Sequence, residues 1–311
     1  MAASTAEVGI LNEPVLRETN LRATMWRNSK RNPVGAFAGL VIVGLVIVAI
    51  LGPGFTVPIV GVDIPSISPH DPTRLDYGRL QSPSLAHPFG TDNLARDMLA
   101  RIMYGARNSL GVAFTAIAVS LLIGVTLGIL SGYLGGPVDM LTQRVVDILQ
   151  AYPALVFAIF FVTVFGREFW VVAVAIGLIL VAGNIRIVRS ATIGIRHQQF
   201  IEAALSVGNS PFRIMYRHVL PNVLAPIIII ASVQIGVAIL IEATLSFLGQ
   251  GVSSATNPSW GRMLQETRPS WQAAWWTMIV PGAAISVAVV AFNVFGDALR
   301  DWLDPRLRGS R

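Results

Sequence analysis

Two side chains in and beside a long apolar stretch could carry polar chemistry inside a membrane. Gln234 lies in the uncharged stretch 219–241, and Glu242 is the first residue after this stretch. Their spacing of eight residues places them within about 80 degrees of each other on a helix with 3.6 residues per turn. They could line a shared solute pathway. Alternatively, Gln234 bonds a neighbouring helix and Glu242 extends to the outer surface, and the sequence favours neither interpretation.

The other residue types that support catalysis or metal binding form no recognisable motif. Lys30 is the only lysine, cysteine is absent, and neither a GxxxxGK[ST] phosphate loop nor a GxSxG serine motif occurs. The histidines are scattered along the chain without an HExxH pattern, so they predict no metal site. They are His70, His87, His197 and His218. The sequence therefore predicts no enzyme and no cofactor in this chain.

A polar, basic island at 202–222 separates two apolar stretches. A short helix is predicted at 201–207, where the Glu202 carboxylate lies favourably at the positive end of the helix dipole. Ala203 and Ala204 have small side chains, so another protein's surface can approach the backbone closely on that face of the helix. These features indicate a docking element. The alternative is an ordinary loop with two amphipathic turns.

The residues after this helix predict a sharp turn and a second helix. Gly208 suits a left-handed stop. Ser210 can cap the free amides of the next helix, and Pro211 suits its first turn. Pro221 disfavours a helical conformation at Leu220. We therefore expect the helix to be interrupted before the next apolar stretch.

Composition places the chain in a membrane, because 53% of its residues are hydrophobic and only 13% are charged. A bilayer core needs about 20 apolar residues per helix. Gly124 and Gly128 are spaced four residues apart in one predicted span, which predicts that another helix packs closely against that span. The sequence thus predicts an all-α membrane protein with six transmembrane helices, at about 34–53, 109–133, 148–166, 169–190, 222–243 and 275–297.

The segments around these spans have different compositions. Residues 1–19 are small and polar and are predicted to be disordered. Residues 20–32 are basic and amphipathic, which favours an elbow helix lying on membrane lipid. Residues 54–108 form a predicted outer segment, with a possible short hairpin early in it and an amphipathic helix at 91–108. Residues 191–221 form the predicted loop that holds the docking element.

The basic residues predict the orientation of the chain. The net charge is +6, which in a membrane protein is more typical of the cytoplasmic face than of nucleic-acid binding. Most of the Lys and Arg residues fall on the cytoplasmic side if the N-terminus is inside. Both termini are therefore predicted to be cytoplasmic, and no nucleic-acid partner is expected.

Several of these motifs resemble one family of transport proteins. Glu202, Ala203 and Ala204, with Gly208 following, resemble the EAA loop of ABC-importer permeases of the type I architecture. Further resemblance to the C-type permeases of dipeptide, oligopeptide and nickel importers comes from HPFGTDNLARDMLARIMYGARNSL, EATLSFLGQGVSSATNPSWGRMLQE and GDALRDWLDPRLRG. Those proteins usually carry Gly where this chain has Ala95, so a continuous helix is expected at that position.

The resemblance implies a permease domain at 33–308 that acts as one transmembrane subunit of a peptide importer in a bacterial cytoplasmic membrane. It implies a second homologous permease, one or two ATPase subunits that bind ATP and Mg, and an extracytoplasmic binding protein. The residues that it assigns to ATPase coupling are Glu202, Ala203, Ala204, Gly208, Ser210 and Pro211. Import of nickel or another small solute is the alternative within this architecture.

Two rival classes fit the sequence less well. A secondary transporter or channel needs an ion relay deep within its spans. Here Glu242 and Asp297 lie only at the ends of apolar stretches. An intramembrane enzyme needs a nucleophile or metal cluster, for which the sequence gives no motif.

Overall fold

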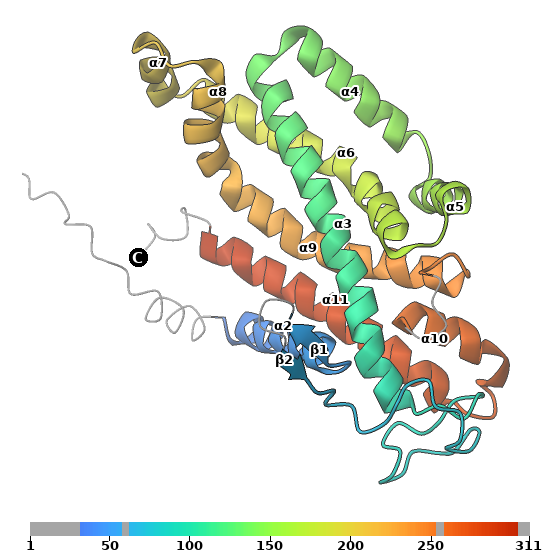
Figure 1. The fold of residues 1–311 in the computed structure, drawn as a ribbon. Helices are drawn as coiled ribbons and strands as arrows, with labels where there is room; N and C mark the ends of the chain where they lie inside the picture. Colours follow the sequence, from blue (N-terminus) through green and yellow to red (C-terminus); the bar gives the residue numbers. More distant parts are fainter. Residues whose placement is uncertain (1–31, 58–61, 253–257, 304–311) are drawn as a thin grey trace, which may run out of the picture.

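The computed structural model describes residues 32–57, 62–252 and 258–303. Long helices run through the molecule, and short helices lie at its two ends (Figure 1). The predicted tail and nearly all of the predicted elbow helix lie outside these residues. The elements are α2 (Pro33–Leu51), β1 (Phe55–Val57), β2 (Val62–Ile64), α3 (Met98–Leu134), α4 (Gly136–Gln150), α5 (Ala154–Phe165), α6 (Phe169–Arg196), α7 (Gln199–Ser206), α8 (Pro211–Ile214), α9 (Leu220–Phe247), α10 (Trp260–Thr267) and α11 (Trp276–Leu303).

The predicted all-α class with six spans is confirmed. Five helical stretches in the described part of the chain are long and apolar enough to cross a membrane, and the bent pair α4 and α5 is a sixth where the two helices are counted as one span. The antiparallel strands β1 and β2 form the short hairpin predicted early in the outer segment.

The third span differs from its predicted bounds of 148–166, because it begins at Gly136 and bends by 89° between α4 and α5. Pro153 explains the bend, since proline lacks a backbone N–H and disfavours a helical conformation in the residue before it. The prediction placed the start of this span too late because α4 contains charged residues, which interrupt the apolar stretch. They pair with α6, where Asp139 Oδ2 lies 2.6 Å from Arg189 Nη2 and Asp147 Oδ1 lies 2.8 Å from Arg186 Nη2.

The second span also differs from the prediction, which placed a separate amphipathic helix at 91–108. Residues 91–97 are not helical, and α3 continues without a break from Met98 to Leu134. Asp97 sets the start, because its side chain accepts a hydrogen bond of 2.8 Å from the N–H of Ala100. No proline interrupts the helix after that point.

Close packing of α3 against α6 forms the centre of the bundle. A Cβ atom added at Gly124 would lie 2.6 Å from the Cβ of Asn184, and one added at Gly128 would lie 2.7 Å from the Cβ of Val188. The predicted small-residue packing of these glycines is therefore confirmed. Ser120 of α3 accepts a hydrogen bond of 2.7 Å from the Asn184 amide within this contact.

The helices expose different elements at the two ends of the bundle (Figure 1). One end carries α7, α8 and the start of α9, and is called the α7 end below. The other carries α10 and the start of α3, and is called the α10 end. The larger cluster of buried apolar side chains extends from the α10 end into the middle of the bundle, and a second cluster lies at the α7 end.

Candidate functional site: the segment from α7 to α9

One face of α7 holds this short helix against the bundle. Ile201 and Ala204 are buried in a cluster that includes Ile214 and Val188 of α6. The helix begins at Gln199, earlier than predicted, and still has Glu202 in its first turn. Glu202 and Ala203 are exposed. The prediction that both alanines form an open face is wrong for Ala204, because Ala204 packs inside the chain.

The end of α7 is a left-handed turn at Gly208, as predicted. Its φ angle is +83°, a value that glycine adopts at little cost. The Gly208 N–H donates to the Leu205 carbonyl at 2.9 Å, and the Asn209 N–H donates to the Ala204 carbonyl at 3.2 Å. Both bonds occupy carbonyls that the end of a helix otherwise leaves unpaired. A side chain at Gly208 would meet no atom within 4 Å, so only the backbone conformation restricts this position.

The second helix starts as predicted but joins α9 differently. Ser210 Oγ accepts a hydrogen bond of 3.4 Å from the Arg213 N–H, and Pro211 occupies the first turn of α8. The predicted interruption at Leu220 is wrong, because Leu220 is helical with φ −52° and ψ −48°. A π-helical turn, Met215–Val219, comes immediately before it. This wider turn makes room for Pro221 without ending the helix.

Large apolar side chains are exposed around the α7–α8 turn. Val207 is 83% exposed, Phe212 is 74% exposed and Tyr216 is 77% exposed. Arg213 and Arg217 are exposed beside them. Apolar side chains that gather on an exposed tip mark a protein contact more often than single exposed residues do. The α7–α8 turn can therefore dock on another protein through an apolar centre with a basic rim.

The two polar residues of α9 lie in different environments. Glu242 is completely buried, and its Oε1 accepts a hydrogen bond of 2.6 Å from Ser246 Oγ. The interpretation that Glu242 extends to the outer surface is therefore wrong. Gln234 is partly buried, and its Oε1 has no hydrogen-bond partner among the described residues. A pathway role for either residue stays a prediction.

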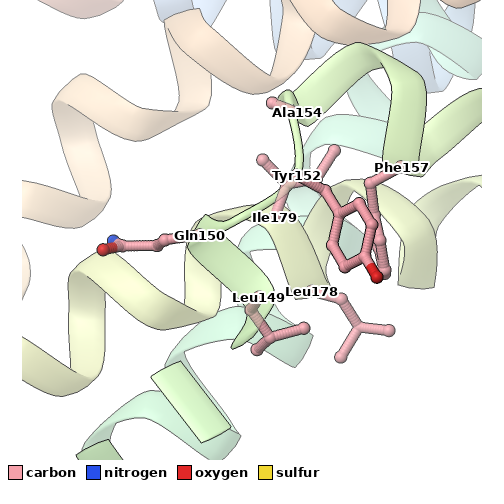
Figure 2. Close-up of a pocket in the computed structure, with 7 residues that line it drawn as sticks. All are labelled: Leu149, Gln150, Tyr152, Ala154, Phe157, Leu178 and Ile179. Carbon is pink, nitrogen blue, oxygen red and sulfur yellow. The ribbon is translucent and has the colours of Figure 1, made fainter. Parts of the chain in front are cut away.

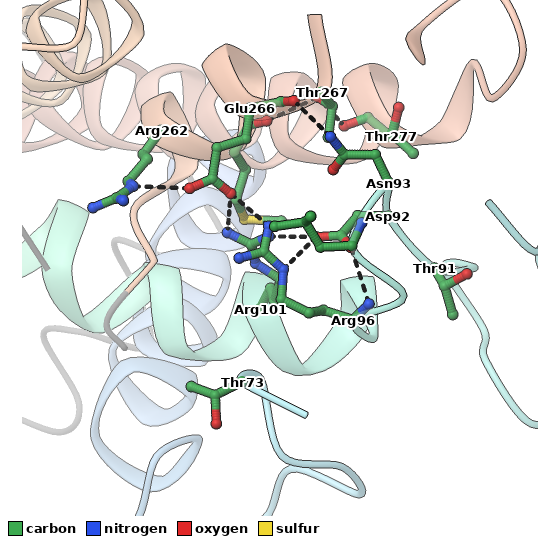
Figure 3. Close-up of polar contacts among 12 residues, drawn as sticks. Thr73, Thr91, Asp92, Asn93, Arg96, Arg101, Arg262, Glu266, Thr267 and Thr277 are labelled. Carbon is green, nitrogen blue, oxygen red and sulfur yellow. Dashed lines mark hydrogen bonds and ion pairs between the residues drawn. The ribbon is translucent and has the colours of Figure 1, made fainter. Parts of the chain in front are cut away.

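A network of ion pairs at the α10 end ties the start of α3 to α10 (Figure 3). Glu266 Oε2 lies 2.6 Å from Arg96 Nη2 and 2.8 Å from Arg101 Nη2, while its Oε1 lies 2.9 Å from Arg262 Nε. Asp92 completes the network by pairing with Arg96 at 2.7 Å and with Arg101. Burial raises the pKa of Glu266, but the charges and hydrogen bonds of Arg101 and Arg96 outweigh it and lower that pKa to about 2.

The sequence interpretation missed this network. The spacing of four residues between Arg262 and Glu266 was the available signal, because such pairs are neighbours on a helix turn. Asp92 and Arg96 have the same spacing but lie in a non-helical turn. The expected continuous helix at Ala95 is also wrong. Ala95 has φ +63° and lies in a tight turn in which its N–H bonds the Asp92 carbonyl at 3.1 Å.

The bend between α4 and α5 borders a cavity of about 340 Å³ (Figure 2). Residues 151–153 are exposed there, in the middle of the bent span. Irregular backbone at membrane depth is tolerated only where it faces protein or water. A bend at that depth would have protein or water beside it rather than lipid. The cavity is lined by Leu149, Gln150, Tyr152, Ala154, Phe157, Leu178 and Ile179.

The histidines are less scattered than predicted. His70 and His87 lie side by side at the α10 end, with ring centroids 4.9 Å apart. Both approach Asp97. Residues 65–97, which bring them together, have almost no regular secondary structure, so periodicity could not predict this contact.

The long apolar helices define a multi-pass membrane protein, and the α7–α8 turn exposes large apolar side chains at one end of it. The chain belongs to the family of binding-protein-dependent transport system inner membrane components, whose sequence model matches residues 124–309. That match includes the whole segment from α7 to α9.

The similarity to known proteins extends over nearly the full length of the chain. A dipeptide transport system permease protein of Alkalihalophilus pseudofirmus is 39% identical over 96% of this chain and 95% of its own length. A glutathione transport system permease protein of Pectobacterium atrosepticum is 36% identical over 95% of each chain. The solved structure of the MetNI methionine ABC transporter in inward-facing conformations has a TM-score of 0.54 at 16% identity. It covers 67% of this chain and 98% of the other. That structural likeness supports the fold alone.

Proposed function

We propose that this chain is one transmembrane subunit of an ATP-driven importer of di- or oligopeptides. The observation that carries the proposal is the match, along nearly the whole chain, to permeases of dipeptide and glutathione transport systems. The exposed α7–α8 turn supports it, because a permease that hydrolyses no ATP needs a contact with a subunit that does. ATP and Mg would be bound by that ATPase subunit.

The α7 end faces the cytoplasm in this proposal. Arg196, Arg213 and Arg217 lie at that end, and basic residues favour the cytoplasmic side of bacterial membrane proteins. The α10 end then faces outward, where a binding protein delivers the peptide. Both chain termini lie on the cytoplasmic side in this arrangement.

Coupling runs through a short chain of packed residues. The apolar centre at Val207 and Phe212 meets the ATPase subunit, and Gly208 fixes the angle between α7 and α8. Ile201 and Ile214 pack together with Val188 of α6. The π-helical turn continues into α9 without a break. Because these residues are packed together and the helix is continuous, movement of the ATPase surface also moves α6 and α9.

A second, homologous permease subunit completes the peptide pathway. The exposed bend at residues 151–153 supports this arrangement, because backbone at that depth needs protein or water beside it. The cavity at the bend offers the amide of Gln150 and the phenol of Tyr152 within an otherwise apolar lining. Gln234 contributes a further polar group to the pathway in this proposal.

Transport in proteoliposomes tests the proposal. The chain is produced with its second permease, its ATPase subunits and its binding protein, and uptake of a labelled dipeptide is measured with ATP inside the liposomes. We expect accumulation that requires both ATP and the binding protein. A complex with an inactive ATPase is the control. Uptake without ATP would indicate a secondary transporter, and ATP-dependent uptake of nickel instead of peptide would overturn the proposed cargo.

A further inference from the structure

Three ligand-type side chains meet at the α10 end, next to the first residue of α3. His87 Nδ1 lies 2.8 Å from Asp97 Oδ1, and His70 Nδ1 lies 3.6 Å from the same oxygen. One nitrogen or oxygen atom from each residue lies within 4.8 Å of the other two. The cluster lies apart from the segment that couples to an ATPase.

The cluster has an unsatisfied polar atom. The Nδ1 of His70 is buried and has no hydrogen-bond partner among the described residues. A buried nitrogen without a hydrogen-bond partner is destabilising, so the site is incomplete as it stands. Because a neutral imidazole nitrogen without a proton is a metal ligand, a metal ion would satisfy this atom.

The charge at Asp97 is also incompletely balanced. Its carboxylate is completely buried and accepts hydrogen bonds from His87 and from the Ala100 N–H. In the described part of the chain no Arg or Lys pairs with it, because Arg96 pairs with Asp92 and Glu266 instead. A cation placed between Asp97 and the two imidazoles would supply the missing positive charge.

Neighbouring rings hold the two imidazoles in place. The Tyr77 ring packs edge-on against both, with centroids 4.9 Å from His70 and 5.0 Å from His87. The side chain of His70 is 25% exposed, which leaves a route from solvent to the cluster. Packing of this kind restricts the rotamers of both imidazoles and so holds possible ligand atoms in place.

We propose that His70, His87 and Asp97 bind one zinc ion. Two imidazole nitrogens and one carboxylate oxygen are typical zinc ligands, and a tetrahedral site with bonds of about 2.0–2.2 Å separates ligand atoms by about 3.4 Å. The observed separations of 2.8 and 3.6 Å lie on either side of this value. Water occupies the fourth position, on the exposed side of His70.

Zinc binding changes the protons at the cluster in a defined way. In the metal-free state the proton between His87 Nδ1 and Asp97 Oδ1 makes their hydrogen bond. The ion replaces this proton, which leaves to solvent, while Nε2 of His87 takes up one proton from solvent. The imidazole therefore stays neutral, and its Nδ1 lone pair binds zinc. The second oxygen of Asp97 continues to cap α3. The bound ion thus fastens residues 70 and 87 to the first turn of a transmembrane helix.

Zinc titration of the full-length chain in lipid nanodiscs tests this site. The protein carries a tag without histidine and is first treated with a chelator. We expect one zinc per chain and a higher melting temperature after zinc is added. The variant His70→Phe keeps an aromatic ring beside Tyr77 but should lower zinc affinity about 100-fold or more. The matched control His197→Phe, at the α7 end, should bind zinc like the unmodified chain.

Cobalt gives a second measurement that does not depend on stability. Co²⁺ added to the unmodified chain should produce the visible absorption bands of a four-coordinate site, and these should vanish in His70→Phe. The proposal is overturned if zinc leaves the melting temperature unchanged and cobalt gives no bands. It is equally overturned if His70→Phe binds zinc as tightly as the unmodified chain.

Discussion

Asn209 donates two hydrogen bonds to the carbonyl oxygen of Ala204, one of 3.2 Å from its backbone N–H and one of 3.1 Å from its side-chain amide. These bonds span the left-handed turn at Gly208. The turn is therefore a fixed corner in which α7 and α8 keep a constant angle. A fixed corner suits an element that transmits force between two subunits.

The first prediction concerns the exposed apolar centre. Replacing Val207 or Phe212 with Ala should weaken association with the ATPase subunit about tenfold, which corresponds to about 1.4 kcal/mol. The melting temperature of the isolated chain should not change, because both side chains are largely exposed. Copurification at graded salt and detergent measures the association. Leu85→Ala, an exposed residue at the α10 end, is the control, and an equal loss in this variant would contradict the assignment.

A second prediction tests the turn at Ala95. In a left-handed conformation glycine is favoured and a β-branched residue is strained by about 1–2 kcal/mol or more. Ala95→Gly should therefore leave a more stable protein than Ala95→Val. A helical Ala95 would give the opposite order, since glycine costs about 1 kcal/mol in a helix and valine costs less. Thermal unfolding of both variants in the same lipid decides between the two orders.

The third prediction concerns pH and the ion-pair network. The pKa of Glu266 is lowered from an ordinary value of 4.5 to about 2 in the folded protein. The network therefore stabilises the fold above about pH 4.5, and this contribution is lost as the pH falls towards about 2. The melting temperature should fall across that window. Glu266→Gln should melt lower at pH 7 and show a shallower fall, whereas the exposed Glu168→Gln should behave like the unmodified chain.

A fourth prediction separates packing from pathway at Gln234. Because its Oε1 has no partner among the described residues, we expect Gln234→Leu to alter transport at unchanged assembly. Gln234→Cys should react with a small water-soluble thiol reagent to an extent that depends on ATP. The chain has no native cysteine, so the reaction reports this position alone. Full protection in every nucleotide state would make Gln234 a packing residue.

Local chemistry predicted much of the candidate site. The conformations at Gly208, Ser210 and Pro211 depend on the residue itself and its nearest neighbours, and the structure has all three as expected. Apolar length is also a local property, and it predicted the spans apart from the early starts of the second and third. Pro221 was misread because the sequence does not reveal the π-helical turn that accommodates it.

The remaining features depend on contacts between distant residues. His70 and His87 meet only because an irregular segment folds back, and Arg96 meets Glu266 across 170 residues. The burial of Glu242 depends on packing against other elements rather than on its position at the end of an apolar stretch. Periodicity and propensity carry no information on such contacts, so the sequence could not place these residues together.

The fifth prediction tests the central claim that the Gly208 corner couples ATP hydrolysis to uptake. Gly208→Val should strain the left-handed turn by about 1–3 kcal/mol while meeting no other atom. Gly194→Val is the matched control, because Gly194 is an exposed residue of α6 with equal space around it and no left-handed backbone.

The deciding measurement follows ATP hydrolysis and dipeptide uptake together in proteoliposomes that contain the complete complex. The account predicts that Gly208→Val inserts and assembles normally and hydrolyses ATP, but loses most of its uptake per ATP. Gly194→Val should keep the ratio of the unmodified complex. An unchanged ratio of uptake to hydrolysis in Gly208→Val would contradict the coupling role of this segment.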